Sequence, residues 1–175
     1  MRQFSAVLLA AGVILMSGCS KVVSLNPVLG EGEGAYDPAL VGVWQEPSGD
    51  DTFLVRWTGE HYTIRYSSKS QSMTFEARLW DANGAKLLDV TATDDDPFRV
   101  AVHVPVRVWI EGAQLRFAFL DSDWIRSLAA SRMAARVTED RTLVLADSAR
   151  VKTFLGEAGC DARAYKDVQT VMRAQ

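Results

Sequence analysis

The chain of 175 residues is poor in the residue types that most often bind metals or attack substrates, with only two cysteines and two histidines. It also has no surplus of basic charge, because 19 Lys and Arg stand against 22 Asp and Glu. A formal net charge of −3 argues against a nucleic acid partner, since phosphate binding depends on Lys and Arg. Beyond the first apolar run the chain has no stretch of ~20 apolar residues, so no transmembrane helix is expected.

Motifs of catalysis and metal binding are missing as well. His61 and His103 show no His-x-x-x-His or His-x-His spacing, and no Gly-x-Ser-x-Gly elbow follows the first apolar run. Three adjacent aspartates before Pro97, at 94–96, are typical of a solvated turn rather than a calcium loop. The sequence therefore predicts no cofactor, no metal site and no catalytic residue. A hydrolase or metal-assisted enzyme using His61 or His103 stays as an alternative, which requires both histidines together in a cleft beside carboxylates.

The N-terminus has the three-part plan of a secretory signal. Arg2 precedes an apolar stretch, Phe4–Met16, that is too short to span a bilayer, and Ser17-Gly18-Cys19 follows. The segment Met16–Cys19 resembles the lipobox of bacterial lipoproteins, although that family prefers Leu at the place of Met16. The resemblance implies a signal peptide over residues 1–18 and a diacylglycerol on the thiol of Cys19. It also implies that the new amine carries an acyl chain such as palmitate.

This resemblance also implies a location. The acyl chains on Cys19 would anchor the protein to a membrane of the bacterial cell envelope. In Gram-negative bacteria, Ser20 after the lipidated cysteine favours the outer membrane, facing the periplasm. With Cys19 lipidated, Cys160 has no intrachain disulfide partner, and we expect it to pack against a surface helix.

Composition divides the rest of the chain into three parts. Residues 19–38 contain the lipidated cysteine and a segment rich in Gly, Pro and charge, which predicts a flexible tether that holds the domain away from the lipid. Residues 39–166 form the folded domain, and we expect the tail at 167–175 to fray.

Strict alternation of apolar and polar residues predicts a mainly β domain. About eight strands joined by short turns are expected, at Leu40–Gln45, Asp51–Thr58, His61–Tyr66, Met73–Trp80, Ala85–Thr93, Arg99–Ile110, Leu115–Leu120 and within Ala135–Ala146. Such a meander closes into an antiparallel up-and-down barrel, or remains a curved sheet that opens or bends at Pro105. Helical spacing predicts two short helices, one after Asp121 and one from Asp147 to Gly159.

Gly42-Val43-Trp44 on the first strand resembles the Gly-x-Trp opening of lipocalins and related small barrels. In that superfamily the tryptophan closes one end of the barrel, often under an arginine from a late strand. The resemblance implies that Gly42 and Trp44 close this barrel, with Arg107 or Arg116 as the arginine. It further implies either a cavity for a small hydrophobic molecule or an outer surface that binds a protein.

Two tryptophans stand out because they lie on the polar faces of their strands. Trp80 and Trp109 are opposite the apolar faces, near strand ends, and we interpret them as a rim that contacts a ligand or partner. The leading hypothesis is a non-enzymatic, membrane-anchored lipoprotein that binds a small hydrophobic ligand or an envelope protein. A purely structural envelope component is a further alternative.

Overall fold

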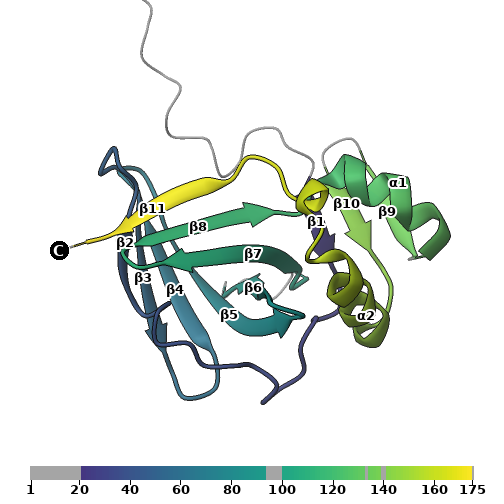
Figure 1. Cartoon of the computed structure of the whole chain (residues 1–175), viewed down its shortest axis with the longest axis horizontal. Helices are drawn as coiled ribbons and strands as arrows, with labels where there is room; N and C mark the ends of the chain where they lie inside the picture. Colours follow the sequence, from purple (N-terminus) through teal and green to yellow (C-terminus); the bar gives the residue numbers. More distant parts are fainter. Residues whose placement is uncertain (1–20, 94–99, 133, 139–140, 175) are drawn as a thin grey trace, which may run out of the picture.

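The computed structural model describes residues 21–93, 100–132, 134–138 and 141–174 (Figure 1). The signal segment, Cys19 and Ser20 lie outside the described residues, as does the acidic turn at 94–97. The predictions that concern these segments are therefore not addressed by the structure.

A closed antiparallel barrel of eight strands forms the centre of the protein, which confirms the predicted lipocalin-like fold. Its strands are β2 (Gly42–Gln45), β3 (Thr52–Trp57), β4 (Tyr62–Ser67), β5 (Ser72–Ala82), β6 (Ala85–Ala92), β7 (His103–Glu111), β8 (Gln114–Phe119) and β11 (Gln169–Arg173). Each pairs with its neighbour in the chain up to β8, and β11 closes the circle between β8 and β2. The expected opening at Pro105 does not occur, because Pro105 stays in register opposite Asp89 of β6.

Turn chemistry supports this meander. The turn between β5 and β6 is Asn83-Gly84, and both residues have positive φ, at 56° and 86°. Hairpin turns of two residues need such φ values to match the twist of the strands, and Asn and Gly adopt them at the lowest cost.

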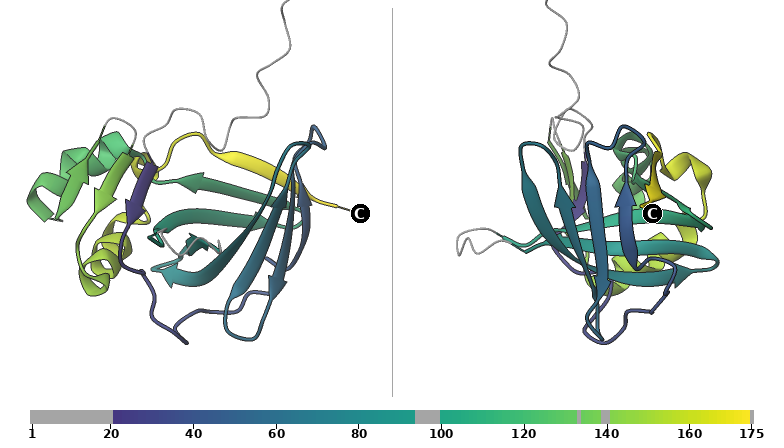
Figure 2. Two further views of the ribbon diagram at one scale, coloured as in Figure 1. Left: turned by 180° about the vertical axis from the view of Figure 1, so that it is seen from behind. Right: turned by 90° about the vertical axis from the view of Figure 1, so that its left-hand side faces the viewer.

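A second layer covers one side of the barrel (Figures 1 and 2). It contains the strands β1 (Lys21–Ser24), β9 (Ala135–Val137) and β10 (Arg141–Val144), the helices α1 (Ser122–Arg132) and α2 (Ser148–Ala158), and the 3₁₀ turn η1 (Ala162–Ala164). Both predicted helices are confirmed, and the Asp147 side chain caps α2 by accepting a hydrogen bond from the backbone N–H of Arg150. The predicted last strand within 135–146 is instead the hairpin β9–β10, which lies outside the barrel.

The tail that was expected to fray is instead the eighth barrel strand. β11 pairs with β8 through Gln169–Met172 and with β2 through Met172 and Arg173. Val171 is 1% exposed in the barrel interior, and Arg173 lies beside Trp44. The strand is short and mostly polar, so its sequence alone does not identify it as a barrel strand. It becomes one by pairing with β8 and β2.

The segment expected to be a flexible tether is folded over residues 21–38. β1 pairs in parallel with β10, and the chain then crosses the outer wall of the barrel with Val28 and Leu29 buried. We call residues 25–34 the strap. Asp89 on β6 holds it by accepting a backbone hydrogen bond from Val28 at 2.8 Å and from Leu29 at 3.4 Å. Burial of the two apolar side chains between Pro27 and Gly30 also holds the strap against the outer wall of the barrel.

Two apolar clusters result. One fills the barrel interior around Trp44 and Tyr62, and the other lies between the outer wall and the helices around Ile125 and Leu155. None of the described helices is long and apolar enough to cross a membrane.

Candidate functional site

Trp44, on the short strand β2, packs inside the barrel. Its side chain is fully buried, and its indole Nε1–H donates to the carbonyl oxygen of Leu40 at 2.9 Å. Leu40, at 2% exposure, belongs to the turn that leads into β2. The guanidinium carbon of Arg173 lies 4.3 Å from the centre of the Trp44 ring, within the range of a cation–π contact.

Arg173 also ties down the turn before β2. It donates from Nη1 to the carbonyl oxygen of Val41 at 2.8 Å and from Nη2 to that of Ala39 at 2.7 Å. Gly42 is required here, because a Cβ at this position would lie 2.4 Å from Nη1 of Arg173. The φ of Gly42 is also 147°, which L side chains rarely adopt. The Gly-x-Trp opening therefore works as a unit with an arginine that is 129 residues further along the chain, from 44 to 173.

The arginine proposed from the sequence was a different one. Arg107 and Arg116 lie on the outer wall, where both guanidinium groups contact the ring of Trp109, at 4.8 Å and 5.6 Å. Arg107 also donates to the carbonyl oxygen of Gly159 at 2.8 Å, which ties the end of α2 to β7. Arg173 was missed because it falls in the segment expected to fray, although its spacing of two from Val171 is the signal of a strand.

Further polar contacts hold Asp37 against the barrel. Lys86 donates a short, charged hydrogen bond to Oδ2 of Asp37, and this bond is the main cause that lowers the pKa of the Asp37 carboxyl. The hydroxyl of Tyr62 accepts from the backbone N–H of Asp37 and donates to its carbonyl oxygen. Burial raises the pKa of Tyr62, which therefore remains a neutral hydroxyl here.

Apolar residues that pack against the barrel core are partly exposed in two places: Val41, Trp57 and Ile110 near the strand ends where Trp44 lies, and a further group nearer the opposite strand ends. The six interior residues of this further group pack against the barrel core but remain partly exposed; we call them the mouth: Phe53, Ile64, Val90, Val104, Phe117 and Phe119. Three of their rings make a continuous row, because Phe117 lies 5.8 Å from Phe53 and 6.2 Å from Phe119, both edge-on. Such a row offers flat, apolar contact area from a rigid scaffold.

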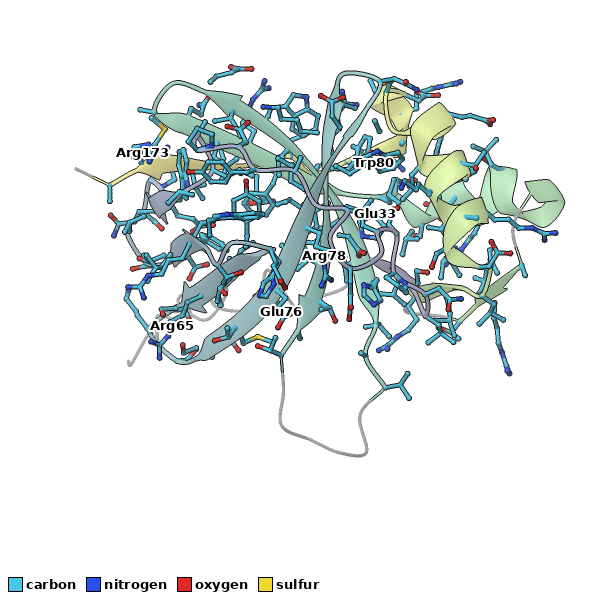
Figure 3. The ribbon with its side chains drawn as sticks, turned by 90° about the horizontal axis from the view of Figure 1, so that it is seen from below. Glu33, Arg65, Glu76, Arg78, Trp80 and Arg173 are labelled. Carbon is cyan, nitrogen blue, oxygen red and sulfur yellow. The ribbon has the colours of Figure 1, made fainter. Side chains whose placement is uncertain are left out.

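Trp80 and Trp109 lie away from the mouth, against the helical layer. Both are partly buried and pack on the outer cluster. The ring of Trp80 faces Gly156 of α2, where a Cβ would be 3.5 Å from Cη2, and Figure 3 shows Trp80 beside the helices. Trp109 meets the ring of Tyr165 edge-on at 6.2 Å. Whether either tryptophan also contacts a ligand stays a prediction.

Two small cavities lie outside the barrel. The first, with a volume of about 10 Å³, has room for about one water molecule between Pro105 on the outer wall and Phe154 of α2. The second lies under the strap beside Val28 and Trp80 and has no such room. Both are apolar gaps in the packing of the second layer rather than binding sites.

The two histidines are on different parts of the outer wall. Nε2 of His61, just before β4, is 3.9 Å from Oε1 of Glu76. Nδ1 of His103, at the start of β7, is 3.1 Å from Oδ1 of Asp89, whose other oxygen holds the strap. Strands β5 and β6 separate β4 from β7, so each histidine has its own carboxylate and the two do not form one cluster. Among the described residues no three His, Cys, Asp or Glu side chains are placed to share a metal ion.

Cys160 follows α2 as the only cysteine of the described residues. Its residue is exposed, and its thiol is 3.5 Å from the carbonyl oxygens of Ala82 and Asn83. The thiol therefore lies against the β5–β6 turn, and the exposed Cys160 is not tucked in as the sequence predicted.

No protein-family model, curated protein or solved structure matches this chain. The class of the protein is therefore defined by its fold, an eight-stranded lipocalin-like barrel with a covering helical layer.

Proposed function

We propose that the protein is a membrane-anchored, non-enzymatic binding module that takes a small hydrophobic ligand at the mouth of its barrel. The observation that carries this proposal is a row of apolar rings in the barrel interior that remains partly exposed. Trp44 and Leu40 are buried, whereas the rings of Phe53, Phe117 and Phe119 are partly exposed. Apolar surface that remains open on a rigid scaffold is typical of a binding site.

The geometry favours a ligand that lies at the mouth rather than deep inside. The barrel interior around Trp44 and Tyr62 is filled by large side chains, and these two are fully buried. A ligand that covers the exposed part of the mouth gains the burial of several phenylalanine faces, at about 25 cal/mol for each Å² removed from water. An acyl chain or a small aromatic compound has the right chemistry for this contact.

The anchor is the second part of the proposal. The lipobox-like segment predicts that the thiol of Cys19 carries a diacylglycerol, and Ser20 favours the outer membrane of a Gram-negative host. The mass of the mature N-terminal peptide tests this directly, because acylation at Cys19 and cleavage after Gly18 define one expected mass.

Native mass spectrometry tests ligand binding. The secreted form, residues 20–175, contains every described element; we expect a reproducible added mass from the cells or after incubation with envelope lipid extract, which is lost on denaturation. A bare protein mass under both conditions would rule out a lipid ligand.

A pair of variants locates the site. Phe119→Gln removes one ring from the mouth, whereas Met172→Gln removes a similar apolar side chain from the outer wall, where Met172 is 41% exposed. With the fluorescent probe N-phenyl-1-naphthylamine, we expect Phe119→Gln to weaken binding about tenfold, since burial of such a side chain is worth about 1.5–3 kcal/mol. Met172→Gln should bind as the parent does, and equal binding by all three proteins would contradict the mouth as the site.

A further inference from the structure

The three-stranded part of the sheet outside the barrel has two different faces. Strand β1 pairs with β10, which pairs with β9 (Figure 2). Val22 and Val144 point from one face into the outer apolar cluster beneath the helices. The residues that alternate with them therefore point away from the helices.

Val23, in the middle of that outward face, is buried at 7% exposure, but the far end of the face is apolar and exposed. Leu145 is 43% exposed and Leu25 is 38% exposed, and each directly follows one of the paired residues Val144 and Ser24. Leu143 is partly exposed on the same face, and the register places Arg136 of β9 beside it. We call Leu25, Leu143, Leu145 and Arg136 the anchor face.

The chain reaches this face directly from the lipidation site. Lys21, the first residue of β1, is only two residues after Cys19. Two residues span about 7 Å even when fully extended. A lipid on Cys19 therefore brings the start of β1 to the level of the lipid headgroups, with no tether to hold the domain away.

We propose that the anchor face lies against the membrane surface, an inference that rests on the proposed lipidation of Cys19. Leucine side chains on a surface held at this distance enter the headgroup region and lose contact with water. Arg136 is suited to the lipid phosphates. This single charge stands beside three leucines, so the apolar residues carry the contact.

This orientation also places the mouth close to the bilayer. Ser24 of β1 pairs with His103, the first residue of β7, and Val104 of the mouth comes directly after it. A ligand with an acyl chain thus has a short path from the lipid layer to the barrel, whereas Trp44 lies toward the opposite end of β7.

Nitroxide labels on the full, lipidated protein test the proposal. In a Cys160→Ser background, acylation leaves Cys19 unavailable, so a single new cysteine takes the label at Leu145 (Leu145→Cys) or, as the control, at Met172 (Met172→Cys). The two sites are exposed to nearly the same degree, 43% and 41%, but Met172 is on the barrel wall at β11. Each protein is reconstituted in vesicles of phosphatidylethanolamine and phosphatidylglycerol, recovered by flotation, and examined by spin-label collision with oxygen and with a water-soluble nickel complex.

We expect the label at position 145 to collide several-fold less with nickel and more with oxygen than the label at position 172. A site that is buried in protein would instead lose both kinds of collision. Floated protein whose two labels are equally accessible to nickel, or equally sheltered from it, would overturn the anchor face and leave the lipid anchor intact. A mature chain that has no acyl group at Cys19 and stays at the bottom of the gradient would overturn both.

Discussion

Replacement of Arg173 by methionine is expected to destabilise the whole barrel, although the residue is third from the C-terminus. The substitution keeps an apolar stem of similar length but removes the charge and every donor. Three contacts disappear: the cation–π contact with Trp44 at 4.3 Å and the hydrogen bonds to the carbonyl oxygens of Val41 and Ala39.

The magnitude follows from these contacts. A hydrogen bond from a charged donor contributes about 1.5–3 kcal/mol, and a cation–π contact contributes about 0.5–2 kcal/mol. The contacts share one side chain and water can replace part of them, so the sum is an upper bound. We expect the free energy of unfolding to fall by about 2–4 kcal/mol, which is a large part of the ~5–15 kcal/mol typical of a small domain.

Urea unfolding followed by tryptophan fluorescence measures this change, and Arg116→Met is the matched control. Arg116 also lies over a tryptophan, but its ion pair with Glu111 is on the surface, and its side chain is 37% exposed. Its loss should cost less than about 1 kcal/mol. If Arg173→Met and Arg116→Met lower the free energy of unfolding by the same amount, the contacts of Arg173 with Trp44 and the turn before β2 do not stabilise the barrel as described.

Three further outcomes are expected. The pKa of Asp37 is lowered, first of all by the hydrogen bond from Lys86, so the native state binds the proton more weakly than the unfolded chain does. The ionised carboxylate therefore stabilises the native state fully above the ordinary Asp pKa of about 3.9, and this stabilisation is lost as the pH falls through the lower native pKa. Asp37→Asn should flatten the acid side of a curve of unfolding free energy against pH. Trp80→Ala and Trp109→Ala should each lower the free energy of unfolding by about 2 kcal/mol or more, because both rings pack on the helical layer. Thermal unfolding measures this, and an unchanged melting temperature would mean that the two rings are a rim that does not contribute to packing. Asp89→Asn should speed hydrogen exchange at the two strap amides that its carboxylate accepts, and unchanged exchange there would show that other contacts hold the strap.

Much of the barrel was predictable because its signals are local. Alternation along a strand depends only on which face is buried, and the turn Asn83-Gly84 needs no distant partner. The seven strands from β2 to β8 follow one another in the chain, so each finds its neighbour across a short loop or, between β6 and β7, a longer one.

The closure of the candidate site was only half predictable. Gly42 and Trp44 form a recognisable triplet, but the arginine that completes them comes from β11, after two helices and two strands outside the barrel. Nothing near Arg173 in the sequence distinguishes it from Arg107 or Arg116. Strand pairing across this long insertion is what selects it.

The sequence by itself determined the fold class, the faces of the strands and the two helices, because period-two and helical patterns record local burial. Only the tertiary structure decided that the N-terminal segment is a strap, that the tail is the eighth strand, and that Arg173 caps Trp44. Each of these rests on contacts between residues that are far apart in the chain. Short segments such as 21–38 and 169–173 bury few apolar groups alone, and they become ordered only when another part of the fold supplies the rest of the contact.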